Sequence, residues 1–228
     1  MRELTIVDSL VEGPAGPAVS LAYARQHIQA LTTADDNMIA IWTAAASGYF
    51  TDQTGRDPIF TVRDALLDAF PFPGRSGREA RIELPHPPLN EVLSVEYVDP
   101  DGNVVPFDDG ASPETRFWTY SAPQGTYAPR GFVEPISGRQ WPIARDETGS
   151  VRIRYRSGYT ADPDQVPDLA RAILCYLIAH FDQFRGAVHE ARKGQVLELP
   201  YGVKAMIDGF KYSAAPTQVL RIRYWPWA

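Results

Sequence analysis

Hydrophobic residues recur at two different spacings along the chain. From Asn37 to Thr54 apolar residues return every three or four positions, as on one face of a helix. The same spacing returns after Pro167, at Ala170, Ile173, Leu174, Leu177, Phe181 and Phe184. Between these stretches, segments such as Val151–Tyr155 alternate apolar and polar residues, as half-buried strands do. The pattern predicts an α+β fold, with a β-rich insertion between N-terminal and C-terminal helices.

Local signals indicate where the helices begin and end. Ser20 is a good N-cap for a first helix over residues 21–30, and Gly55 follows the second helix as a plausible terminator. A shorter last helix is expected over residues 203–210. The helices on either side of the insertion are too amphipathic to stand alone. We therefore expect about four helices to pack into one bundle.

The insertion is expected to be antiparallel and rich in turns. Strand-like segments cover residues 81–84, 92–98 and 151–155, and clusters of Pro, Gly, Asp and Asn separate them. Residues 106–145 are rich in Pro and aromatic residues and match no clear element. The predicted organisation is listed by range: an N-terminal arm over 1–18, the helical bundle over 19–57 and 158–213, the β insertion over 58–157, and a C-terminal tail over 214–228.

Composition and charge narrow the classes of function. The chain has 228 residues, of which 44% are hydrophobic and 22% charged, as is ordinary for a globular protein. No segment has the apolar length of a membrane span, and the N-terminus lacks a secretion-signal pattern, so we expect folding in the cytoplasm. The formal net charge of −6 argues against tight wrapping of DNA. It allows DNA to pass nearby, because an acidic wall repels phosphate.

The sequence offers no positive sign of catalysis. It contains no nucleophile elbow, phosphate loop or H-E-x-x-H pattern, and its four histidines are His27, His86, His180 and His189. Asp99, Asp101 and Asn103 begin like a calcium loop, but the spacing that follows favours a hairpin turn. The single cysteine, Cys175, falls in an apolar helix and is expected to be inert. We predict no catalytic, metal or cofactor residue, and expect that the protein is not an enzyme.

Two features suggest contacts with other chains. Arg152, Arg154 and Arg156 line one face of a predicted strand, which is either a solvated face or a face toward acidic groups of a neighbouring subunit. The tail combines arginine and aromatic side chains, as interface hot spots do, at Arg221, Arg223, Tyr224, Trp225 and Trp227. This tail either folds back on its own domain or docks on a partner.

Several distinctive motifs follow one another along the chain. They are V-S-L-A-Y-A-R-Q-H-I at 19–28, D-D-N-M-I at 35–39, I-E-L-P-H-P-P-L at 82–89, V-L-S-V-E-Y-V-D at 92–99, W-P at 141–142, V-R-I-R-Y-R-S-G-Y at 151–159, V-P-D-L-A-R-A-I at 166–173 and L-P-Y-G-V at 199–203. In this order they resemble the head–tail connector (adaptor) family of long-tailed phages and gene transfer agents. The similarity covers about residues 19–213. The arm, the stretch around 106–140 and the tail depart from it.

The resemblance implies a structural ring, expected to be a dodecamer, under the portal protein at the head–tail junction of a virion. Such a ring extends the DNA channel and presents a platform to a stopper or tail-completion protein. In the family a C-terminal segment commonly reaches the portal, which here would be residues 214–228. The alternatives are another ring of the same assembly, such as the stopper or tail terminator, or an enzyme of phage assembly.

Overall fold

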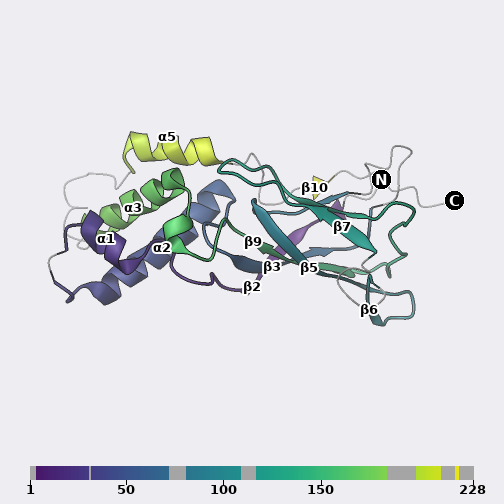
Figure 1. Cartoon of the computed structure of the whole chain (residues 1–228). Coiled ribbons are helices and arrows are strands. Elements are labelled where there is room, and N and C mark those ends of the chain that lie inside the picture. Colours follow the sequence, from purple (N-terminus) through teal and green to yellow (C-terminus); the bar gives the residue numbers. More distant parts are fainter. Residues whose placement is uncertain are drawn as a thin grey trace. The chain divides into compact units, whose positions relative to one another are not determined.

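The computed structural model describes residues 4–30, 32–71, 81–108, 117–183, 199–211 and 219–220. Along the chain, two short strands precede the first two α-helices, most of the strands follow, and helices then return before a last short strand (Figure 1). The chain divides into two compact units. The β unit comprises Met1–Gly13, Thr61–Gly158 and Ser213–Ala228, and the helical unit comprises Pro14–Phe60 and Tyr159–Tyr212. The predicted α+β class is confirmed.

The helical unit contains four α-helices, within the described residues, and the sequence signals account for several of their ends. These helices are α1 (Leu21–His27), α2 (Asp36–Thr54), α3 (Asp168–Gln183) and α5 (Tyr201–Phe210), and a 3-10 turn, η3 (Pro163–Gln165), precedes α3. Ser20 caps α1, since its Oγ accepts from the Tyr23 N–H at 3.4 Å. Gly55 ends α2 in the left-handed conformation, with φ 68°.

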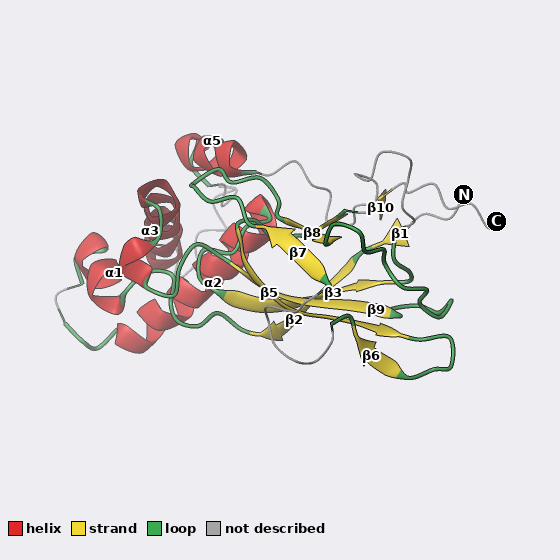
Figure 2. Cartoon of the chain, turned by 45° about the vertical axis from the view of Figure 1, so that its right-hand side comes forward, coloured by secondary structure: helices red, strands yellow, loops and turns green. Residues whose placement is uncertain are grey.

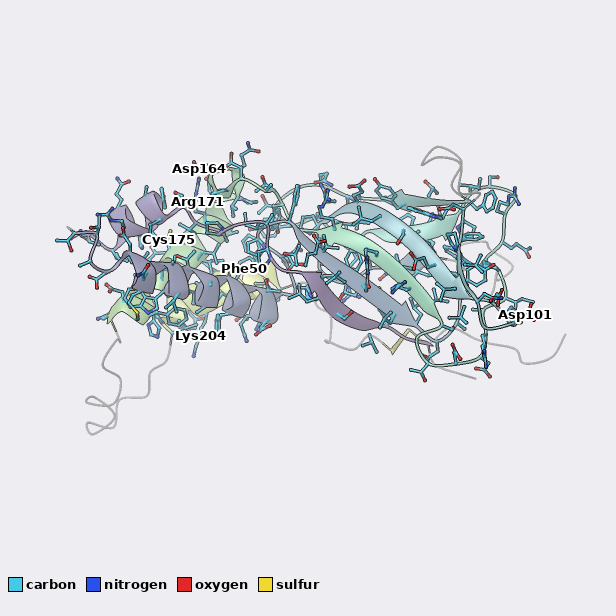
Figure 3. All side chains as sticks on the ribbon, turned by 90° about the horizontal axis from the view of Figure 1, so that it is seen from below. Phe50, Asp101, Asp164, Arg171, Cys175 and Lys204 are labelled. Atoms are coloured by element: carbon cyan, nitrogen blue, oxygen red, sulfur yellow. The ribbon has the colours of Figure 1, made fainter. Side chains whose placement is uncertain are left out.

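The core of the helical unit is apolar, and α3 lies at its centre. Six residues of α3 are buried, namely Ala170, Ile173, Leu174, Cys175, Leu177 and Ile178. Helix α2 packs against α1, α3 and α5, and the Phe50 ring meets Phe210 of α5 edge-on, with centroids 5.6 Å apart. Arg56 closes this end of the unit, because its Nε donates to the Phe210 carbonyl at 2.9 Å. Cys175 and Phe50 lie among the helices in Figure 3.

The β unit is built from antiparallel sheets. The larger sheet has the strand order β2-β3-β9-β5-β6, and the smaller one β4-β8-β7. The strands are β2 (Val7–Glu12), β3 (Thr61–Leu67), β4 (Ile82–Glu83), β5 (Leu89–Val98), β6 (Val104–Pro106), β7 (Trp118–Ser121), β8 (Phe132–Pro135) and β9 (Val151–Ser157). A two-stranded sheet pairs β1 (Leu4–Thr5) with β10 (Val219–Leu220) (Figure 2).

One hydrophobic core joins the larger and the smaller sheet. Val151, Ile153 and Tyr155 alternate along β9 with the three arginines, and these apolar residues are fully buried. They pack in one cluster with Ile82 and Val133 of the smaller sheet. Aromatic side chains extend the cluster, and the Phe70 and Trp141 rings stack with centroids 4.6 Å apart. The alternation that predicted a half-buried strand therefore places the arginines on the opposite face.

The hairpin predicted between Val98 and Val104 is confirmed. These two residues pair across β5 and β6, and Asp99 Oδ1 accepts from the Asn103 N–H at 2.8 Å. The backbone and side-chain hydrogen bonds from Asn103 lower the pKa of Asp99. The same oxygens that suggested a calcium loop thus serve the turn.

The sequence patterns missed several strands. Val7–Glu12 falls in the expected arm, but forms β2 and pairs with β3. Strand β3, which lies between β2 and β9, was not predicted either, because it is buried in an irregular pattern that includes Asp64. Within the stretch 106–145, which matched no clear element, β7 and β8 pair over Trp118–Ser121.

Candidate interaction surfaces

The three arginines of β9 lie in a row, and each has an acidic partner on a neighbouring strand of the same chain. Arg154 binds Asp64 of β3 through two parallel hydrogen bonds, from Nε to Oδ1 at 2.8 Å and from Nη2 to Oδ2 at 3.0 Å. Arg152 pairs with Glu96 of β5. Arg156 Nη1 lies 3.1 Å from Glu91 Oε2, also on β5.

This row is a self-neutralised polar face of the larger sheet. Hydrogen bonds to Asp64 raise the pKa of Arg154, so that its charge persists at any ordinary pH. The arginine side chains remain 36–42% exposed, and pairs of this kind contribute about 0–1 kcal/mol each. The partners within the chain were not predicted. Contact of Arg152, Arg154 and Arg156 with a neighbouring subunit stays a prediction.

A second polar cluster ties the edge strand β2 to the rest of the β unit. Its centre is Asp8 of β2. Oδ1 accepts from the Tyr155 hydroxyl at 2.7 Å, and Oδ2 accepts from Arg63 Nη1 at 2.7 Å. His86 Nε2 lies 3.2 Å from the same Oδ2. Residues from three separate parts of the chain thus converge on the carboxylate of a fourth.

The Asp8 carboxylate is held in its charged form. Burial by itself raises the pKa of Asp8, but the hydrogen bonds from His86 and Tyr155 and the positive charges of His86 and Arg63 together lower it below the ordinary 3.8. His86 adopts a left-handed backbone with φ 56°, which is uncommon outside glycine. His86 stands between Pro85 and Pro87, and in this backbone conformation its imidazole faces the carboxylate.

The other histidines and the cysteine considered in the sequence do not come together in one described site. His27 meets Tyr176 edge-on in the helical unit, and burial lowers the pKa of His180. His189 lies outside the described residues. Cys175 is buried as expected, and burial raises the pKa of its thiol to about 11. Among the described residues, no group of three His, Cys, Asp or Glu side chains could hold a metal ion.

The C-terminal residues singled out by composition lie outside the part that the structure describes. These are Arg221, Arg223, Tyr224, Trp225 and Trp227. The strand just before them, β10, pairs in register with β1, as Leu4 with Leu220 and Thr5 with Val219. Val219 and Leu220 of the predicted tail thus lie beside the N-terminal strand. No helix among the described residues has the length and apolarity to cross a membrane.

Four packed helices interrupted along the chain by two antiparallel sheets define the fold. No family model and no curated protein matches the sequence. Among solved structures, a chain from the neck of an empty gene transfer agent particle computed with C6 symmetry matches with a TM-score of 0.68 and 20% identity, over 92% of this chain and 97% of that one.

Two further structures give the same result. A chain from the virion of a native gene transfer agent particle matches with a TM-score of 0.68 and 20% identity. A chain from the neck of the native particle computed with C12 symmetry matches with a TM-score of 0.65 and 19% identity. Each match covers 92% of this chain and 97% of the other. This chain therefore shares its fold with a chain of the gene transfer agent neck.

Proposed function

We propose that the protein is a structural subunit of the head–tail junction of a phage or phage-like particle. Within that junction, we propose that its copies form the connector (adaptor) ring beneath the portal. The observation that carries the proposal is the likeness of fold over nearly the whole of both chains to a chain from a gene transfer agent neck. The ordered sequence motifs that resemble the connector family support the same assignment independently of the coordinates.

The proposed ring is a dodecamer that extends the DNA channel without binding a particular sequence. The C12 symmetry used for the native neck that contains the similar chain supports this copy number. The net charge of −6 suits a channel component, since phosphate is repelled and does not stick to an acidic wall. In this proposal the ring carries no catalytic site, and its partners are its own copies, the portal and the next tail component.

Localisation in assembled particles is the direct test. We expect electron microscopy of particles that contain this chain to place twelve copies between the portal and the tail. A position further down the tail would assign the chain to a stopper or tail terminator instead. Absence of the chain from purified particles would overturn the structural role altogether.

The contact with the portal is proposed to use the end of the tail. A variant that lacks residues 221–228 retains Val219–Leu220 and hence the β1–β10 pairing. We expect this variant to fold as the full chain does but to lose binding to its portal protein in co-sedimentation. A second, narrower variant tests the aromatic residues alone by replacing only Trp225 and Trp227 by alanine. If both variants bound the portal as tightly as the full chain, the tail would have no part in the contact.

A further inference from the structure

Helix α2 is unusual for a helix at the surface of a small bundle, because it carries almost no charge. Asp36 and Asp52 are its only charged residues. Two hydroxyls in its middle bond back onto the helix itself: Thr43 Oγ1 donates to the Ile39 carbonyl and Ser47 Oγ donates to the Thr43 carbonyl, each at 2.8 Å. A helix that is apolar all round is typical of one that is covered on all sides.

The apolar residues of α2 form two stripes with the same spacing, displaced by one residue. The first stripe is buried against the other helices of the unit and consists of Ile39, Trp42, Ala46 and Phe50. The second, which we call the outer stripe, consists of Met38, Ile41, Ala45 and Tyr49, and all four are exposed. Ile41 is 59% exposed. Among the described residues of the helical unit nothing covers the outer stripe.

Gly48 lies beside the outer stripe, and the fold of a single chain gives no reason for a glycine there. A Cβ added at Gly48 would meet no atom within 4 Å. Glycine in a helix interior costs about 0.5–1 kcal/mol relative to alanine. A glycine at such a position is explained when another backbone approaches the helix closely. Gly48 and the exposed Ala44 and Ala45 together leave only small side chains on this part of the apolar surface.

We propose that the outer stripe of α2 is the surface on which a second copy of this chain packs in the ring. The inference rests on the proposed function and adds the face that makes the contact. The occupant is a second copy because the similar chain belongs to a neck computed with cyclic symmetry. An uncharged stripe also suits a contact between copies of a chain of net charge −6, because it brings no acidic groups together.

Cyclic symmetry requires a different surface on the neighbouring copy, since each subunit in a ring contacts the next one head to tail. A second exposed hydrophobic surface, with two tyrosines, lies along the seam between α1 and α3. It comprises Leu21, Tyr23 and Tyr176, which are 39%, 43% and 49% exposed. Arg171 stacks over the Tyr23 ring, and His27 meets Tyr176 edge-on. These contacts hold the two tyrosine side chains in place. Tyrosine is enriched at protein–protein interfaces. We expect the α1–α3 seam to receive α2.

A pair of matched charge substitutions tests the outer stripe. Ala45→Glu places a carboxylate in the middle of the stripe, and Ala205→Glu makes the same change at an exposed position of α5. Sedimentation velocity and electron microscopy of the full chain, alone and with its portal protein, measure ring formation. We expect Ala45→Glu to weaken self-association by about tenfold or more, because a buried unpaired charge is strongly disfavoured. Ala205→Glu should assemble as the wild type does.

The outcomes separate this inference from the proposed function. If the wild-type chain formed rings and Ala45→Glu formed them equally well, the α2 interface would be overturned while the ring function stood. If the wild-type chain formed no ring, alone or with the portal, the proposed function itself would fail. Circular dichroism of both variants shows whether either loses its fold. If Ala45→Glu were unfolded, Ile41→Ser, a smaller change on the same stripe, would decide between these outcomes.

Gly48→Ala gives a readout that a merely structural role of the stripe would not produce. The added methyl group should raise the thermal stability of the monomer and at the same time weaken ring formation, since it fills the place left for a second backbone. An increase in stability without any loss of assembly would argue against close packing at Gly48.

Photocross-linking identifies the partner surface. A benzophenone amino acid at position 45 should link to peptides that contain residues 21–27 or 168–183 of another copy, while the same group at position 205 should give no such product. A cross-link from position 45 to a different protein would overturn the second copy as the occupant. A cross-link to another part of a second copy would retain the α2 face and reject the α1–α3 seam.

Discussion

In the β unit, charged side chains meet partners of opposite charge within the same chain, whereas α2 of the helical unit has few charges and an apolar stripe that its own unit leaves bare. Arg154 with Asp64 and Arg63 with Asp8 represent the first case. Met38 and Ile41 represent the second. A self-satisfied polar surface favours solubility, and an uncovered apolar one marks a place for association. In the proposed ring, the apolar stripe of α2 is therefore a candidate contact between copies, whereas these ion pairs of the β unit are already satisfied within one chain.

The largest expected effect on stability comes from removing an aromatic side chain from the core of the helical unit. Phe50 is fully buried against Phe210, and Phe50→Ala should lower the free energy of unfolding by about 3–5 kcal/mol. Urea denaturation followed by circular dichroism measures the loss. Tyr49→Ala, one residue away on the outer stripe, should change stability by about 0.5 kcal/mol or less but weaken assembly. Equal losses for both variants would contradict the assignment of buried and outer stripes.

The stability of the β unit should depend on the Asp8 carboxylate, as the stability of the helical unit depends on the Phe50 side chain. Asp8→Asn removes the charge that faces Arg63 and His86. We expect a loss of about 2 kcal/mol, below the roughly 3–5 kcal/mol of a fully buried pair, because Asp8 keeps 15% of its side chain exposed. The control is Asp101→Asn in the exposed turn that Figure 3 labels. A neutral result for Asp8→Asn would mean that the cluster does not stabilise β2.

Glycine-to-alanine substitutions should have opposite signs in the two units. A Cβ at Gly131 would lie 2.4 Å from Leu89 Cδ2 and 2.8 Å from the Ser121 carbonyl oxygen. Overpacking of this kind costs about 1–3 kcal/mol, so Gly131→Ala should lower the melting temperature. Gly48→Ala should raise it by removing backbone freedom from the unfolded chain. If both substitutions shifted the melting temperature in the same direction, the contrast between the close approach at Gly131 and the open space at Gly48 would be wrong.

Acid should weaken the β unit through Asp8. The pKa of this carboxyl is lowered in the folded state, so its contribution is fully present above the unfolded value of about 3.8 and is lost as pH falls through the folded value. Stability of the wild type should therefore decline below pH 4 more steeply than that of Asp8→Asn. Urea titrations at a series of pH values compare the two slopes. Parallel curves would show that Asp8 is not the group responsible.

The smallest effect concerns the one cysteine, which reports on the helical unit alone. Because burial raises the pKa of Cys175 to about 11, its thiol should react slowly with a disulfide reagent at pH 8 in the folded protein and quickly in urea. Phe50→Ala should speed this reaction in the native state, whereas Asp8→Asn should leave it unchanged. Equal acceleration by both variants would indicate that the units open together.

Sequence patterns predicted the helices well, for a physical reason. A helix is a local structure, so Ser20, the periodic apolar positions and Gly55 signal it within one stretch of the chain. Strand β9 was predicted because it is central and strictly alternating. In contrast, β2 is an edge strand with exposed Val7 and Leu10, and its short run before a Gly-Pro segment looks like an arm.

The polar clusters lay beyond sequence reasoning, because their members are far apart in the chain. Asp8 and Tyr155 are 147 positions apart, and Arg154 and Asp64 are 90. No local spacing marks such pairs, although an acidic residue inside a buried strand, as at Asp64, is a signal that a cation must lie nearby. The outer stripe of α2 could have been found from sequence alone, because the helix has no charged residue between Asp36 and Asp52 and more apolar positions than one buried face requires.

The interruption of the helical unit has a consequence during synthesis of the chain. Helix α2 is complete at Thr54, but α3, which covers its buried stripe, begins only at Asp168, after about 110 residues of intervening chain. At about 5–20 residues per second, the side of the nascent α2 that α3 covers, like the outer stripe, remains uncovered for roughly 6–22 seconds on the ribosome. Through that interval α2 offers a hydrophobic segment to any chaperone that meets emerging chains, and only the later return of the polypeptide closes one of its two sides.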